Sequence, residues 1–129
     1  SVGGKKSAFA GYYLHIDPVQ SFAGGGKWMP EADTLKRIRQ EIDYNGQDLV
    51  NILEQPDFKK YFNTIEGEKL KRMPKGFPED HPNIELLKHK SFLAMHKIHD
   101  DEITNPDFIA KSVLVFKALK PVGDFLNRE

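Results

Sequence analysis

Apolar positions near the start of the chain follow the two-residue period of a half-buried strand. This pattern predicts a strand over residues 8–17, in which Tyr12, Leu14 and Ile16 share one face. It also predicts a second strand over 21–29, returning antiparallel to the first, and a third over 91–98. Pro18 ends the first strand, since proline cannot donate to a strand ladder.

Helical spacing replaces this alternation between the second and third strands. Pro30 opens a predicted helix over residues 30–44, with Leu35, Ile38 and Ile42 on its apolar face. Asn45-Gly46 is a stop signal. Short helices are predicted over 47–54, from Pro56 to Phe62 and over 83–89.

The remaining segments are an irregular stretch and a final helix. Residues 64–82 contain two glycines and three prolines, so we predict extended structure with a strand near 69–73. Asn105-Pro106 predicts the start of the last helix, and Pro121 should break or kink it. Strands and helices do not alternate strictly, so the pattern favours an α+β fold, a small antiparallel sheet packed with several helices.

Composition narrows the class of protein. The 129 residues suffice for a single domain over 1–129. The 19 basic residues are balanced by 19 acidic ones, which disfavours a nucleic-acid or membrane-surface partner. There is no cysteine, which excludes disulfides and zinc–thiolate sites. We expect a cytoplasmic protein that crosses no membrane.

The glycine triplet Gly24-Gly25-Gly26, followed by Lys27, raises the question of a phosphate loop. Such a loop needs backbone N–H groups at a helix N-terminus, with a Ser or Thr after the lysine. Here Trp28 follows the lysine, and the helix begins later, at Pro30. We therefore interpret the triplet as a β-bulge or tight strand return.

Several phrases, in this order and spacing, resemble one known family. They are Gly11-Tyr12-Tyr13-Leu14-His15-Ile16, Gly24-Gly25-Gly26, Trp28-Met29-Pro30, Leu35 with Ile38-Arg39, residues 70–77 with His81-Pro82, Leu86-Leu87-Lys88, Lys90-Ser91 and Phe125-Leu126-Asn127. The chain resembles the family named domain of unknown function 2461, conserved hypothetical proteins of bacteria and fungi. The resemblance implies that the chain corresponds to the C-terminal portion of a longer protein with a helical N-terminal part.

Basic residues supply the best candidate ligand-binding groups. Lys71, Arg72 and Lys75 lie in a stretch without an acid, and could bind a phosphate or carboxylate. The alternative is a solvated edge. Arg39, at the border of an apolar helix face, could join this site or be a structural arginine.

Histidines supply the candidates for acid–base chemistry. His15 shares its strand face with Tyr13, and such a pair could move a proton; the alternative is a polar sheet face. His81 is a further candidate. His96 and His99 precede three acids, but on a strand they would face opposite sides, so we expect no metal site and no cofactor.

Three functions therefore stay open for the chain. It could be a domain that binds an anionic small molecule or phosphorylated ligand through an Arg/Lys cluster. It could be an enzyme whose site is completed by a missing N-terminal portion. It could be a structural or interaction module, with a homodimer formed through a surface exposed by truncation.

Overall fold

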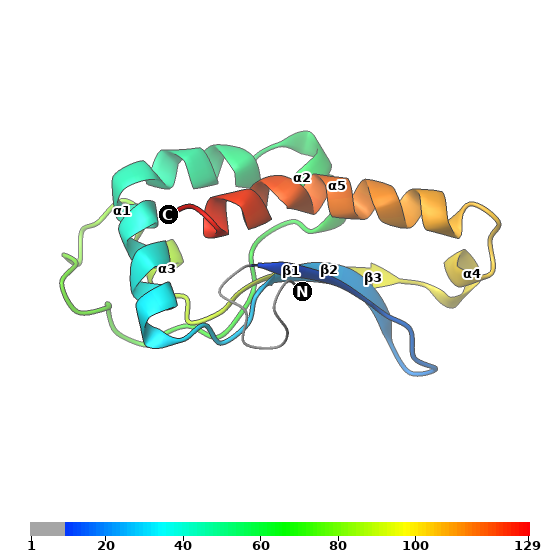
Figure 1. The fold of residues 1–129 in the computed structure, drawn as a ribbon, viewed down its shortest axis with the longest axis horizontal. Coiled ribbons are helices and arrows are strands. Elements are labelled where there is room, and N and C mark those ends of the chain that lie inside the picture. The colour runs from blue at the N-terminus through cyan, green and yellow to red at the C-terminus, as the bar shows by residue number, and fades with distance from the viewer. Residues whose placement is uncertain (1–9) are drawn as a thin grey trace.

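The computed structural model describes residues 10–129 as an α+β fold of two layers (Figure 1). One layer is a three-stranded antiparallel sheet in the order β1-β2-β3. The other consists of helices. The strands are β1 (Gly11–His15), β2 (Ser21–Lys27) and β3 (Phe92–Ile98), and the helices are α1 (Ala32–Leu53), α2 (Pro56–Tyr61), α3 (Ile84–Leu87), α4 (Asp100–Ile103) and α5 (Phe108–Leu126).

The sheet confirms the three predicted strands and the hairpin between the first two. Residues 8 and 9 of the first prediction lie outside the described residues. The glycine triplet lies within the central strand, as the return arm of the hairpin; Gly24 pairs with Tyr13 on one side and Met95 on the other. The register from Ser21 to Lys27 is unbroken on β3, so the β-bulge interpretation is wrong and the strand-return interpretation is confirmed.

Glycine is required in β2 because the neighbouring backbones approach too closely for a side chain. A Cβ on Gly24 would collide with the carbonyl oxygen of Ala94, and one on Gly25 with that of Gly11. Gly26 also has a φ of +124°, which disfavours L side chains, and its Cβ would collide with the carbonyl of Phe92. The triplet therefore allows the strongly curved central strand that Figure 1 shows.

Helix α5 covers one face of the sheet and supplies much of the core. Val115, Leu119 and Val122 are buried, and the ring of Phe116 meets that of Tyr12 edge-on, with centroids 5.9 Å apart. The predicted break at Pro121 is wrong, because α5 continues through it. Burial of Val122 and of the last-turn residues Phe125 and Leu126 offsets the hydrogen bond that proline cannot donate.

The two helices predicted on either side of Asn45-Gly46 are one kinked helix. Asn45 has non-helical backbone angles, φ −130° and ψ 32°, within α1. Gly46 is buried, and a Cβ there would collide with the side chain of Asn83. The stop signal therefore produces a sharp turn of the helix, and the second part of α1 then runs beside α5 (Figure 1).

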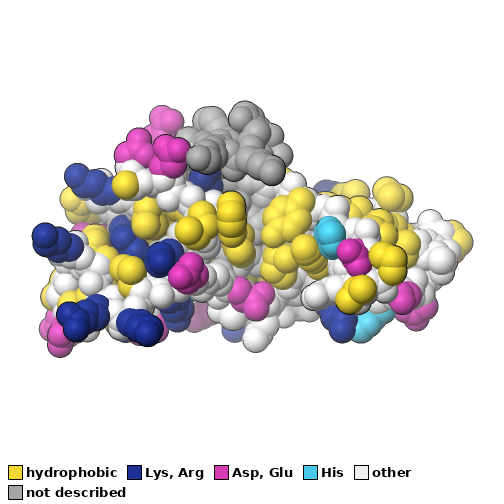
Figure 2. All heavy atoms as spheres, turned by 90° about the horizontal axis from the view of Figure 1, so that it is seen from below, with side chains coloured by type: hydrophobic (Ala, Val, Ile, Leu, Met, Phe, Trp, Pro, Cys, Tyr) yellow, Lys and Arg dark blue, Asp and Glu magenta, His cyan; other side chains and the backbone are white. Residues whose placement is uncertain are grey.

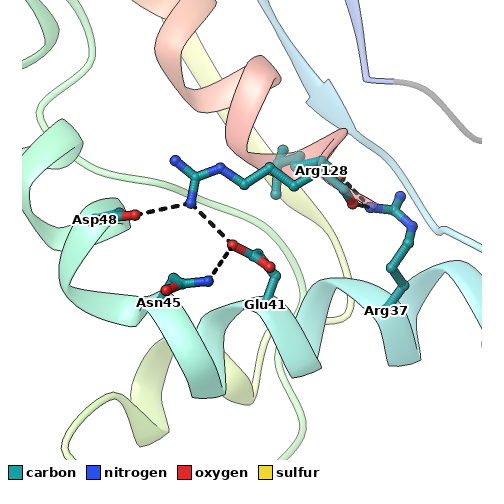
Figure 3. A network of polar contacts seen from close by, with 6 residues as sticks. Arg37, Glu41, Asn45, Asp48 and Arg128 are labelled. Atoms are coloured by element: carbon teal, nitrogen blue, oxygen red, sulfur yellow. Dashed lines mark hydrogen bonds and ion pairs between the residues drawn. The ribbon is translucent and has the colours of Figure 1, made fainter.

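A polar network joins the kink of α1 to the end of α5 (Figure 3). The Nη1 atom of Arg128 donates to Glu41 and Asp48, on opposite sides of the kink, at 3.0 Å each. Asn45 donates to the same Glu41 carboxylate at 2.8 Å. Arg37 donates to the carbonyls of Leu126 and Arg128. These contacts hold the C-terminal end against α1.

Residues 64–82 are irregular, as predicted, but the strand expected near 69–73 is wrong. Lys69 forms an isolated antiparallel bridge with His89, and Glu66 forms another with Leu93. Gly67 and the prolines prevent longer pairing. The last helix begins at Phe108 rather than at Asn105-Pro106; the Asn105 side chain instead accepts from the N–H of Asp107 in the preceding turn. The short α4 was not predicted.

The opposite face of the sheet carries none of the described helices. Figure 2 looks onto this side, where hydrophobic side chains gather across the middle and Lys and Arg side chains gather toward the end that holds α3. Among residues 10–129, no helix has the length and apolar character needed to cross a membrane.

We expect Gly26→Ala to destabilise the protein more than Gly76→Ala. Both glycines have positive φ, +124° and +95°, which costs an alanine on the order of 1–3 kcal/mol. A Cβ on Gly76 would meet nothing within 4 Å, whereas one on Gly26 would overlap a paired strand. Urea unfolding should show a further loss of about 1–3 kcal/mol for Gly26→Ala. Equal losses would contradict the close approach of β2 and β3.

Candidate functional site

A basic hollow of about 800 Å³ lies between α3 and the segment that precedes it. Its cations are Lys71, Arg72 and Lys88, and Met73 and Ile84 add an apolar wall. The segment is fixed beside the end of α3 by two backbone hydrogen bonds, from Leu70 N to Lys88 O at 2.8 Å and from Lys90 N to Glu68 O at 2.7 Å. The hollow therefore rests on an anchored backbone.

The acids of the hollow are unequally neutralised. Lys69 and Lys88 each lie 3.2 Å from an oxygen of Glu85, and their hydrogen bonds lower the pKa of Glu85 below its ordinary value. Glu79 also lines the hollow. Within residues 10–129, neither Lys71 nor Arg72 forms an ion pair or hydrogen bond. These two cations are therefore available to an anion.

Arg39 does not line this hollow. Its Nε donates to the carbonyl of Leu87 at 2.8 Å and its Nη2 to that of His89 at 3.1 Å. The edge of the guanidinium that would grip a carboxylate in bidentate fashion is thus already occupied. Burial lowers the pKa of Arg39. This placement is that of a structural arginine.

His89, the second residue held by Arg39, is itself buried. Its Nδ1 lies 3.0 Å from the carbonyl oxygen of Ser91, and its ring lies 5.4 Å from that of Phe92. Burial lowers the pKa of this imidazole, which favours its neutral form. Arg39 and His89 together fix the path from α3 into β3.

Lys75 also lies outside the residues that line the basic hollow. It is exposed, next to Gly76. The four basic residues considered together in the sequence, Arg39, Lys71, Arg72 and Lys75, therefore do not line one hollow. The structure brings together Lys71 and Arg72, and adds Lys88.

His15 and Tyr13 share the uncovered sheet face, but the Phe22 ring separates them. The Phe22 centroid lies 5.6 Å from that of Tyr13 and 4.9 Å from that of His15. The Tyr13 hydroxyl donates to the sulfur of Met95 at 3.1 Å, and burial raises the Tyr13 pKa. Tyr13 and His15 are thus not in contact as an acid–base pair.

His15 lines a second hollow, of about 510 Å³, on this sheet face. Its Nε2 lies 3.5 Å from Asp17, and Glu66 and Lys97 are also part of the lining. Large apolar side chains are also exposed near the hairpin that carries His15, on both sides of the sheet, since Tyr12 packs on Phe116 of α5 and Tyr13 on Phe22. They are Tyr12, Tyr13, Leu14, Ile16, Val19, Trp28 and Met29. Exposed apolar side chains of this kind suit contact with another molecule.

His81, the third acid–base candidate, joins α1 to the turn before α3. Its Nε2 lies 2.7 Å from Asp43, and its Nδ1 accepts from the N–H of Asn83 at 3.0 Å. Nε2 therefore carries the proton donated to Asp43. Both ring nitrogens have partners, and the hollow of His15 does not include His81.

Comparison with known protein families finds one family whose sequence model matches this chain. The sequence model of the family described as "Conserved hypothetical protein (DUF2461)" matches residues 1–125. The chain belongs to the DUF2461 family. Comparisons with curated proteins and with solved structures find no match. The family description names no activity, so the function of this DUF2461 chain has to be inferred from its sites.

A third cavity in the DUF2461 chain involves a residue that the sequence did not single out as a binding group. His96 lies between Ala94 and Ile98 on β3 and faces α5 rather than the exposed sheet face. The sequence does carry one sign of this placement, because His96 alternates with the apolar residues Ala94 and Ile98. The cavity itself depends on where α2 and α5 lie, which the sequence pattern could not give.

Removal of Arg39 and removal of Arg72 should affect this DUF2461 chain differently. Arg39→Ala leaves the carbonyls of Leu87 and His89 without their donor, and we expect a loss on the order of 2–4 kcal/mol in the free energy of unfolding. Arg72→Ala removes an exposed side chain that has no partner among residues 10–129, and it should change the free energy of unfolding by less than about 0.5 kcal/mol. Urea unfolding of both variants checks this difference; equal losses would contradict it.

Proposed function

We propose that this DUF2461 chain binds a small anionic molecule, bearing a phosphate or carboxylate group, in the basic hollow. The observation that carries the proposal is the pair Lys71 and Arg72. These neighbouring cations line one hollow and are not neutralised by any carboxylate within residues 10–129. A guanidinium offers two parallel N–H donors to an anion, and a lysine beside it adds a point charge.

The surroundings of Arg72 support an anion rather than a cation as the ligand. Lys69 and Lys88 neutralise Glu85, which leaves Glu79 as the hollow's unpaired acid. Lys71 and Arg72 outnumber it, so the local field attracts negative charge. Glu79 can accept a hydrogen bond from a hydroxyl or amino group of the same ligand.

The apolar wall limits the kind of ligand. Met73 and Ile84 contribute hydrocarbon surface beside the cations, so a ligand with a short carbon skeleton would bury apolar area there. The basic patch is local in a chain with zero formal net charge. An extended polyanion such as a nucleic acid would meet acidic surface beyond it.

Inorganic phosphate is the simplest probe of the Arg72 site. We expect saturable chemical-shift changes in residues 71–73 and 84–88 when ¹⁵N-labelled protein is titrated with phosphate. Arg72→Gln should weaken binding about tenfold or more, because charge-assisted hydrogen bonds are lost. Added NaCl should weaken it as well, since the site is exposed to screening.

Lys117→Gln provides the matched control, because Lys117 is exposed on α5 and loses the same charge. Its phosphate affinity should stay near that of the unsubstituted protein. If Lys117→Gln and Arg72→Gln weaken binding equally, the effect reflects net charge and the proposed site is wrong. Shifts scattered over the lysines of the whole surface would overturn it too.

A further inference from the structure

A cavity of about 340 Å³ lies between the sheet and the first turns of α5, on the helix-covered side. Its floor consists of core residues, including Ala23 from β2, Ile98 from β3 and Val115 from α5. Tyr61, at the end of α2, and Phe108, at the start of α5, also line it. A cavity of this size and apolar character is typical of a small-molecule site.

His96 provides a polar group that would orient a ligand in this cavity. Its Nδ1 lies 3.0 Å from the carbonyl oxygen of Tyr61. A carbonyl can only accept, so Nδ1 carries the proton and Nε2 of the neutral ring presents a lone pair. The ring is held in this orientation by edge-on contact with the Tyr61 ring, at 5.4 Å between centroids.

Nε2 of His96 is accessible and has no partner among the described residues. Across residues 10–129, every buried side-chain nitrogen or oxygen has a hydrogen-bond partner. Nε2 forms no hydrogen bond there, and His96 is partly buried, so this atom is not enclosed in the core. Since His96 lines the cavity, we infer that a molecule inside reaches Nε2 as its acceptor.

Each charged residue at the rim, Lys60, Glu102 and Lys111, has a partner within the protein. Lys111 lies 3.4 Å from Asp107, and the ammonium of Lys60 lies 5.2 Å from the centre of the Tyr61 ring. One oxygen of Glu102 accepts from the N–H of His99. The rim therefore offers little excess positive charge, and the interior acceptor favours a donor on the ligand.

We propose that this cavity binds a neutral, mainly apolar molecule of one or two rings that donates one hydroxyl or N–H hydrogen bond to His96 Nε2. The rings would lie on Ala23, Ile98 and Val115, beside the Tyr61 and Phe108 rings. This site is separate from the basic hollow and independent of the anion proposed to bind there.

Phenol and anisole provide a matched pair of probes, because methylation removes the hydroxyl donor and leaves the ring. In ¹⁵N-detected titrations to about 10 mM, phenol should give saturable shifts at Ala23, Ile98 and Val115. Anisole should bind about three- to tenfold more weakly, the value of one hydrogen bond. Benzoate should also bind more weakly than phenol, since His96 presents a lone pair.

With these probes, the proposal would be overturned by the absence of saturable phenol shifts at these residues, by equal affinity for anisole, or by tighter binding of benzoate than of phenol. His96→Phe should reduce the affinity for phenol to that for anisole, and an unchanged preference for phenol in the folded variant would contradict the role of Nε2.

A substitution at the mouth of the cavity provides a test that leaves His96 and the buried core unchanged. Leu114 lines the cavity and is half exposed, whereas its neighbour Val113 is similarly exposed but outside the lining. Leu114→Trp should abolish the phenol shifts by narrowing the mouth, and Val113→Trp should preserve them. If both variants bind alike, the phenol site lies elsewhere and the proposal is wrong.

Discussion

The contact between Arg39 and the end of α3 links three parts of the molecule. Arg39 belongs to the first part of α1, Leu87 to α3, and His89 to the passage into β3. Without a donor, the two carbonyl oxygens at this junction would lose hydrogen bonds in a partly buried place. The same junction carries Lys88 and Lys90, whose backbone groups anchor the segment before Lys71. The basic hollow thus depends on a structural arginine that lies outside it.

Arg39 and Arg72 therefore have different environments, which suit different roles. Arg39 donates two hydrogen bonds to main-chain oxygens, and its charge is partly removed from water. Arg72 is exposed, with no protein partner among the described residues. A guanidinium already bound to carbonyls stabilises the fold, whereas an unpartnered one beside a lysine can bind an external anion. The glycine triplet is a second motif with a structural role, since it permits close approach of the neighbouring backbones and the curvature of β2.

Local signals predicted the strands, the hairpin and the α+β class, because alternation and turn residues act over a few positions. These local signals gave wrong predictions in segments whose structure is determined by tertiary packing. Asn45-Gly46 bends a helix rather than ending it, because residues on both sides of the kink are held by Arg128. Pro121 is tolerated because the residues beyond it are buried against the rest of the core.

The candidate site was predicted in part, for a comparable reason. Lys71 and Arg72 were found because they are neighbours in sequence, and Lys88 joins them through the pairing of the two segments. The side chain of Arg39 could not be assigned to a site or to the core without knowing what packs on α1. The cavity at His96 required the positions of α2 and α5, which no local pattern encodes.

In the function proposed above, Arg72 binds the anion and Arg39 supports the structure. The most direct test records the side-chain Nε–H signals of the four arginines during a titration with inorganic phosphate. We expect a saturable shift of the Arg72 signal, and an Arg39 signal that stays in place and exchanges slowly with water. A phosphate-dependent shift of Arg39 with an unchanged Arg72 would contradict it.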